Sequence, residues 1–180
     1  MLLSTKRLEL RTIKSSDKEA FFKYRSNAIA NIYQDWIPKS LKEVEAYIKN
    51  KPTVPNQPNT WFQFGLIEKS SCKLIGDIGL HFIENDDKQV EIGYTLNKDF
   101  QGKGYATEAL KCIINYIFID LNKYRIFASV DPRNIPSIKL LERLGFRKEA
   151  HFEKSIYFKG EWVDDIIYEL LQQEWRNKTE

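Results

Sequence analysis

The chain has 180 residues, of which 42% are hydrophobic, enough for a sizeable core in one domain with little room for a second. This composition excludes intrinsic disorder. The 28 Lys and Arg residues against 25 Asp and Glu leave a net charge of only +3. Such a weak, dispersed excess is not the clustered basic surface that nucleic-acid binding requires, so we expect no direct nucleic-acid contact.

The sequence indicates neither a membrane protein nor a metalloprotein. The apolar stretch at residues 110–121 contains Lys111, Asn115 and Asp120, and it is far shorter than the ~20 apolar residues of a membrane-spanning helix. The first residues lack the apolar stretch of a secretory signal, so we expect a cytoplasmic location. No spacing suggests a metal site or a disulfide. We therefore interpret four isolated residues as structural ones: Cys72, Cys112, His81 and His151.

The first half of the chain predicts one strand, two helices and a three-stranded meander. Residues 6–13 alternate between apolar and polar side chains, which is typical of a half-buried strand. Capping boxes at Ser16–Glu19 and Ser40–Glu43 each precede an apolar stripe with helical spacing. The meander strands are rich in β-branched and aromatic residues. They are expected at residues 60–68, 73–83 and 89–96, with turns at 69–72 and 84–88.

The second half predicts a crossover followed by a hairpin. A helix at residues 105–120 leads into a strand at 124–130, an order that favours parallel pairing with the preceding strand. Asn134 and Gly145 mark the ends of a further helix. Two extended segments at residues 146–159 and 162–171 follow, and a charged tail at 172–180 ends the chain. We therefore expect an α/β (α+β) fold with residues 1–180 in one domain.

The segment Gln101–Ala106 lies between a predicted strand and a predicted helix. The first N–H groups of a helix have no internal partner, and glycines let the backbone approach a ligand closely, so an anion such as phosphate suits this position. The dinucleotide fingerprint is excluded because Ala106 and Thr107 stand where a third glycine is needed. An NTP loop is excluded because no GKS or GKT follows. A plain strand-to-helix turn would also use glycine.

Two motifs resemble those of the GCN5-related N-acetyltransferase (GNAT) superfamily. Gln101, Gly104 and Ala106 match the Q/R-x-x-G-x-G/A pattern of its acetyl-CoA loop. The segment 134–146 matches a second pattern of that family, N-x-x-S-x-x-L-x-E-x-x-G-F. The residues 5–11 and 160–175 further resemble the RimJ/RimL-type branch. The resemblance covers nearly the whole chain, and it implies a mixed, mostly antiparallel twisted sheet of about seven strands flanked by helices.

The resemblance also implies an acetyl-CoA site between a pair of splayed strands, with no metal. The pyrophosphate would be held by the loop, and the pantetheine arm by a strand and the following helix. The implied loop residues are Gln101, Gly102, Lys103, Gly104, Tyr105, Ala106 and Thr107. The implied pantetheine contacts are Ile92, Gly93, Tyr94, Thr95, Leu96, Asn134 and Ser137.

The implied reaction is direct transfer of the acetyl group to a primary amine. The amine must lose a proton, and Glu91 is the candidate base, although it also fits a solvent-facing strand position, and Glu149 and Glu153 remain alternatives. A backbone N–H near residues 94–96 would stabilise the oxyanion. Many relatives place a tyrosine after the asparagine of the second motif to protonate CoA, but Leu141 follows Leu140 here. Ser137 is therefore the candidate donor to sulfur.

The acceptor amine is the open part of this interpretation. Three segments should line the acceptor side of the site: residues 29–37, 51–59 and 155–162. Aromatic side chains there would form the wall of a groove, and acidic ones would attract a cationic amine. These are Tyr33, Trp36, Trp61, Tyr157, Trp162, Asp35, Asp164 and Asp165. A protein N-terminal α-amine, a polyamine and an aminoglycoside all remain possible acceptors. A catalytically silent CoA-binding module is a further alternative, and both a monomer and a homodimer are open.

Overall fold

A computed structural model describes residues 2–83 and 87–179. The strands are β1 (Leu2–Ser4), β2 (Leu8–Thr12), β3 (Thr60–Glu68), β4 (Lys73–Phe82), β5 (Gln89–Leu96), β6 (Arg125–Val130), β7 (Arg147–Phe158) and β8 (Glu161–Leu171). The α-helices are α1 (Lys18–Arg25), α2 (Leu41–Lys49), α3 (Tyr105–Asn115), α4 (Ile135–Leu144) and α5 (Gln172–Thr179). Shorter helical turns are η1 (Ser15–Asp17), η2 (Lys98–Phe100) and η3 (Tyr116–Asp120).

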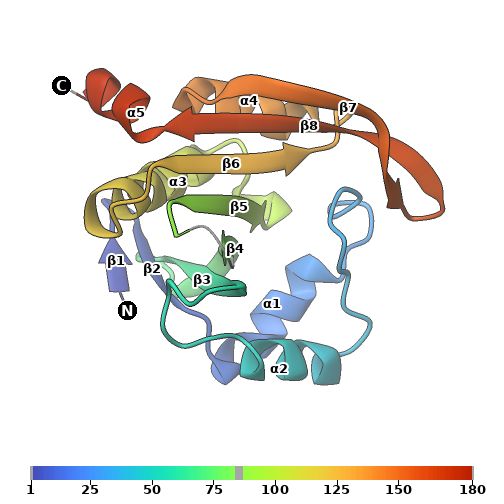
Figure 1. The fold of residues 1–180 in the computed structure, drawn as a ribbon. Helices are drawn as coiled ribbons and strands as arrows, with labels where there is room; N and C mark the ends of the chain where they lie inside the picture. Colours follow the sequence, from blue (N-terminus) through green and yellow to red (C-terminus); the bar gives the residue numbers. More distant parts are fainter. Residues whose placement is uncertain (1, 84–86, 180) are drawn as a thin grey trace.

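In the described part of the chain, eight strands form one sheet in the order β1-β2-β3-β4-β5-β6-β8-β7. β5 and β6 are parallel, and the other neighbouring pairs are antiparallel. Helices flank this sheet, with α1 and α2 well separated from α3 and α4 (Figure 1). The expected mixed α/β fold and its parallel crossover are confirmed. The eighth strand is β1, whose three residues pair with β2 and carry too little periodicity to be predicted.

Three local expectations are wrong. The first helix is not capped by Ser16. The Asp17 carboxylate accepts the backbone N–H of Lys14, and the turn η1 begins at Ser15 with Lys14 as its N-cap. Residues 172–179 form α5 rather than a charged tail, since Trp175 is buried and donates from Nε1 to Asn115 Oδ1 over 2.7 Å. Cys72 is exposed, in a turn with a φ of 56°.

Other expectations hold. Cys112 packs against the core, and Ser40 caps α2 by accepting the backbone N–H of Glu43. The predicted helix at 105–120 continues from α3 into the π-helical turn η3. The turn predicted at 84–88 falls partly on residues 84–86, which lie outside the described residues. Among the residues that are described, no helix is long and apolar enough to span a bilayer.

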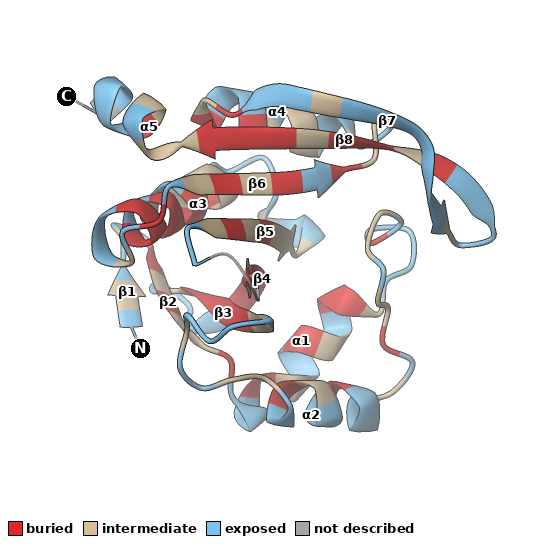
Figure 2. Cartoon of the chain, in the orientation of Figure 1, coloured by how far each residue is buried: buried red, intermediate tan, exposed pale blue. Residues whose placement is uncertain are grey.

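Each face of the sheet carries its own hydrophobic cluster. One cluster joins the sheet to α3 and α4, and the other joins α1 and α2 to one end of β3 and β4. Burial is concentrated in the middle strands and in β8, whereas β7 at the edge is largely exposed (Figure 2). These clusters fix the helices on both sides of β5, which is the strand that the site is built on.

A buried ion pair also fastens α1 to the sheet. The Arg25 guanidinium donates to both carboxylate oxygens of Asp77, which is fully buried in β4. Tyr24 donates its hydroxyl to the same carboxylate over 2.6 Å, and Gln63 donates from its amide. A buried charge is tolerated when it is paired and hydrogen-bonded in this way. The positive charge of Arg25 is therefore compensated within the protein.

The pairing of β5 with β6 stops after three residue pairs. It runs from Gln89 opposite Arg125 to Glu91 opposite Phe127. Beyond that point β5 stays paired with β4, and β6 stays paired with β8, so the two strands separate within an otherwise continuous sheet. Among the described residues, no strand therefore pairs with the β6-facing edge of β5 over residues 92–96. Backbone groups without a strand partner can bind an extended ligand as an added strand would.

Candidate active site

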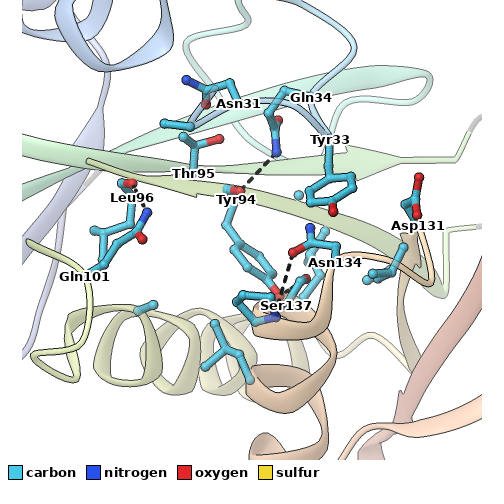
Figure 3. Close-up of a pocket in the computed structure, with 18 of the residues that line it drawn as sticks. Asn31, Tyr33, Gln34, Tyr94, Thr95, Leu96, Gln101, Asp131, Asn134 and Ser137 are labelled. Atoms are coloured by element: carbon cyan, nitrogen blue, oxygen red, sulfur yellow. Dashed lines mark hydrogen bonds between the residues drawn. The ribbon is translucent and has the colours of Figure 1, made fainter. Parts of the chain in front are cut away.

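A cavity of about 610 Å³ lies between β5, the start of α3 and the start of α4 (Figure 3). The structure brings together here nearly all the residues expected to bind the cofactor. The lining includes Ile92, Gly93, Tyr94, Thr95, Leu96, Gln101, Gly102, Gly104, Tyr105, Ala106, Thr107, Asn134 and Ser137. Lys103 differs, because its ammonium turns back to donate to the carbonyl of Asp99 over 2.8 Å.

The loop at one end of this cavity suits an anion. Gly102 and Gly104 have φ values of 73° and 81°, a left-handed conformation that glycine adopts without steric cost. Gly104 is also the N-cap of α3 and has no side chain to bind the first N–H groups of that helix. Gln101 closes the loop by donating to the carbonyl of Leu96 over 2.9 Å. These backbone groups fit a phosphate at a helix N-terminus.

Two buried polar atoms in the lining point to a polar ligand. Asn31 Oδ1 and Thr95 Oγ1 have no hydrogen-bond partner among the described residues. Asn31 is 2% exposed, and its amide nitrogen is already used in a 2.6 Å bond to the carbonyl of Tyr24. Buried polar groups are almost always hydrogen-bonded, so these two oxygens are suited to a ligand. Sequence analysis missed Asn31, which lies in an irregular segment without a motif.

A second cavity of about 420 Å³ lies beside α2, β3 and the β7–β8 hairpin. Acidic side chains in its lining are Asp35, Glu91, Asp131, Asp164 and Asp165, and aromatic ones are Tyr33, Trp36, Tyr47, Trp61 and Phe158. Of the two basic side chains in the lining, Arg25 is paired with Asp77, and burial together with the Arg25 charge lowers the pKa of Lys51. Asp131 is in turn paired with Arg133. The remaining carboxylates of the lining outnumber its basic groups, so the cavity is suited to a positively charged guest.

This second cavity matches the expected acceptor side only in part. Residues 29–37 contribute Tyr33 and Trp36, as expected, whereas the loop at 51–59 contributes only Lys51. From the hairpin, Ile156 and Phe158 line the cavity. Tyr157 and Trp162 instead lie exposed on the hairpin, with their ring centroids 5.5 Å apart. Since side chains alternate along a strand, this pair lies on the face of the hairpin opposite to Ile156 and Phe158, outside the cavity wall.

The two cavities meet where β5 and β6 separate. They share the lining residues Tyr33, Gln34, Ile92, Gly93, Ser129 and Asp131. The indole of Trp61 lies against Gly79 of β4 and Gly93 of β5 at this point. A Cβ at Gly79 would lie 3.0 Å from the indole, a tight contact that would require the ring to shift. A group bound at the inner end of the first cavity is thus accessible from the second.

Glu91 lies beside this junction, at the last pair before the strands separate. Its Oε2 is 3.1 Å from Nδ1 of His81, and both side chains are about one quarter exposed. The His81 ring in turn stacks on Trp61, with centroids 4.8 Å apart. The alternative bases are less well placed. Glu149 and Glu153 are exposed on β7, where Glu149 pairs with Arg147.

Ser137 lies in the first turn of α4 and its backbone N–H donates to the capping Asn134. The Ser137 Oγ is 2.7 Å from the phenolic oxygen of Tyr94, which reaches it from β5 (Figure 3). Burial raises the pKa of Tyr94 to about 12, despite the opposing hydrogen bond with Ser137. The resemblance implied Tyr94 as a contact of the pantetheine arm, but no pattern in the sequence indicates this side-chain contact with Ser137.

Known proteins resemble this chain in sequence. A family model described as "Acetyltransferase (GNAT) domain" matches residues 7–147. The "Uncharacterized N-acetyltransferase YnaD" of Bacillus subtilis is 33% identical over 178 residues, covering 97% of this chain and 99% of that protein. The "[Ribosomal protein uS5]-alanine N-acetyltransferase" of Escherichia coli is 31% identical over 115 residues, covering 63% of this chain and 59% of that protein.

Solved structures show the same fold. A GNAT-family acetyltransferase from Bacillus anthracis has a TM-score of 0.86 at 27% identity, covering 96% of this chain and 99% of that one. A RimL ribosomal L7/L12 α-N-protein acetyltransferase in complex with CoA has a TM-score of 0.83 at 20% identity, covering 95% and 98%. On the family match, the full-length relative and the shared fold, the chain belongs to the GNAT family of acetyl-CoA-dependent N-acetyltransferases.

Proposed function

We propose that this N-acetyltransferase acetylates the α-amine of a peptide N-terminus. The observation that carries the proposal is the junction of the two cavities at Gly93 and Ser129. One cavity offers helix N–H groups and a free strand edge, which suit the phosphates and the pantetheine arm of acetyl-CoA. The other offers carboxylates, which suit a cationic amine. The thioester and the amine would meet where the strands separate.

Glu91 is the proposed base. The bound ammonium gives one proton to Glu91, and the resulting amine attacks the thioester carbonyl to form a tetrahedral intermediate. A backbone N–H on the free edge of β5 would stabilise its oxyanion. When the intermediate collapses, the C–S bond breaks and its electron pair stays on sulfur, where Ser137 donates a hydrogen bond. The nitrogen loses its second proton to solvent as the intermediate collapses, and Glu91 later releases the first, so the products are the amide, the CoA thiolate and two protons.

The β7–β8 hairpin beside the second cavity favours a peptide over a small amine. Ile156 on this hairpin lines the cavity, and Tyr157 and Trp162 are 64% and 61% exposed on the other face of the hairpin. Large exposed apolar side chains beside a site are typical of a surface that binds a partner. The residues that follow a bound N-terminus would reach this aromatic pair. A polyamine would use the carboxylates without contacting it.

Replacing Ala106 with proline tests the phosphate site. Ala106 is the second residue of α3, and α4 already carries Pro136 at the same position, where proline is tolerated. The variant loses one N–H at the loop, so we expect the Kd of CoA to rise about tenfold, roughly 1.4 kcal/mol. Lys42→Pro is the matched control in α2. Equal CoA affinity of the Ala106→Pro and Lys42→Pro variants would contradict a phosphate site at this loop.

Replacing Glu91 with glutamine tests the base. We expect kcat to fall at least tenfold, on the order of 1.4 kcal/mol in the barrier, because the amide cannot accept the proton. The rate of the variant should recover partly as pH rises, since more of the amine is then already neutral. Glu149→Gln is the control among the alternative bases. A normal kcat in Glu91→Gln, measured as CoA thiol release, would eliminate Glu91 from the role.

Replacing Trp162 with alanine tests the class of acceptor. Peptides beginning with Ser, Ala or Met should show a KM raised roughly tenfold, since a packed aromatic anchor contributes more than ~1 kcal/mol. The KM of spermidine, if it is acetylated at all, should not change. Tyr124→Ala is the control, because Tyr124 is 56% exposed just before β6. Turnover of spermidine but of no peptide would instead assign a small-molecule acceptor.

A further inference from the structure

The described chain places a phenol opposite Ser137, although α4 lacks the tyrosine that the family resemblance implies. Leu141 is fully buried and packs in the core rather than in the cavity. Tyr94 comes instead from β5, and its ring crosses toward the first turn of α4 (Figure 3). Its hydroxyl is 2.7 Å from Ser137 Oγ, and both residues line the first cavity. The two hydroxyls therefore form one hydrogen-bonded pair across that cavity.

The surroundings of Tyr94 fix where its hydroxyl lies. The residue stays in the β4–β5 ladder opposite Ile78, and its side chain packs against the core cluster. Its neighbour Gly93 lies at the junction of the cavities. The pair formed by Tyr94 and Ser137 is thus held by two rigid elements, a strand and a helix, next to the place where the thioester must lie.

The chemistry of the two hydroxyls sets the direction of their hydrogen bond. A serine hydroxyl has one proton to donate and two lone pairs that accept, and a phenol is a stronger acid than an aliphatic alcohol. The better arrangement for anion binding has Tyr94 donating to Ser137 Oγ, because the Ser137 proton is then free to point into the cavity. Two hydrogen bonds in series also polarise each other. A phenol is protonated at neutral pH, and burial raises the pKa of Tyr94 further, so its proton is available for this hydrogen bond.

We propose that Tyr94 is a positioning residue which, by donating to Ser137 Oγ, directs the Ser137 proton at the sulfur of the departing CoA thiolate. The inference rests on the proposed function. As the C–S bond breaks, the electron pair on sulfur accepts the hydrogen bond from Ser137, and no proton leaves either hydroxyl. Without Tyr94, the Ser137 hydroxyl rotates among other acceptors and stabilises the thiolate less.

A double-mutant cycle tests this coupling. Tyr94→Phe keeps the ring, so we expect it to lower kcat about tenfold while the KM of acetyl-CoA changes less than about twofold. In a Ser137→Ala background, Tyr94→Phe should change kcat less than about twofold, because the hydroxyl that it orients is gone. Equal losses in both backgrounds would mean that the phenol acts without Ser137. A loss confined to KM would mean that it only shapes the cavity. Either result overturns the proposal.

Tyr168→Phe is the matched control. The Tyr168 hydroxyl also bonds to α4, at Glu142 Oε1 over 3.0 Å, but the residue lies in β8, outside the lining of either cavity. We expect normal kcat for this variant. Thermal unfolding of each variant shows whether the fold is kept.

Titration of bound CoA gives a readout that needs no acceptor. The ultraviolet absorbance of the thiolate reports the pKa of the CoA thiol on the enzyme. We expect this pKa to be lower on the wild type than on Tyr94→Phe, because the oriented hydroxyl favours the charged form. Tight CoA binding with the same thiol pKa in both proteins would overturn the role of Tyr94 and leave the proposed function intact. Failure of the wild type to bind CoA would overturn both.

Discussion

The separation of β5 from β6 is the constraint on which the rest of the site depends. A parallel pair normally continues for the length of its strands, but here it ends at Glu91 and Phe127 while both strands keep their outer partners. The sheet therefore stays intact and yet opens in its middle. The gap between the strands leaves backbone groups of β5 accessible from the first cavity and connects that cavity to the second. A fully paired sheet would keep a thioester and an amine apart.

The position of a residue along β5 then decides which cavity its side chain lines. Tyr94 points toward α4, and Thr95 points to the other side, toward Asn31 (Figure 3), yet both line the first cavity. Glu91 lies on the same face of β5 as Thr95 but lines the second cavity. The proposed base thus lies before the point where the strands separate, and the hydroxyl of Tyr94 lies beyond it. The two hydrophobic clusters hold the helices in place against the two faces of the sheet.

The sequence was sufficient for features that depend on local pattern, and it failed where contacts are distant. Periodicity predicted the meander and α3, and a motif of a few residues located the loop at Gly104. Local sequence pattern could not predict α5, a polar segment in which Trp175 is buried and bonded to Asn115 of α3. The contact of Tyr94 with Ser137 joins residues 43 positions apart, so no local pattern encodes it. The placement of Glu91 in the acidic cavity likewise required the fold.

We propose that CoA and a peptide N-terminus occupy the joined cavities at the same time. This is tested by the Kd of a bisubstrate conjugate in which the CoA sulfur is linked through an acetyl bridge to the α-amine of a short Ser- or Ala-initiated peptide. We expect binding at least ~100-fold tighter than that of CoA alone, because the linker makes the second contact intramolecular. A conjugate that binds no more tightly than CoA would contradict it.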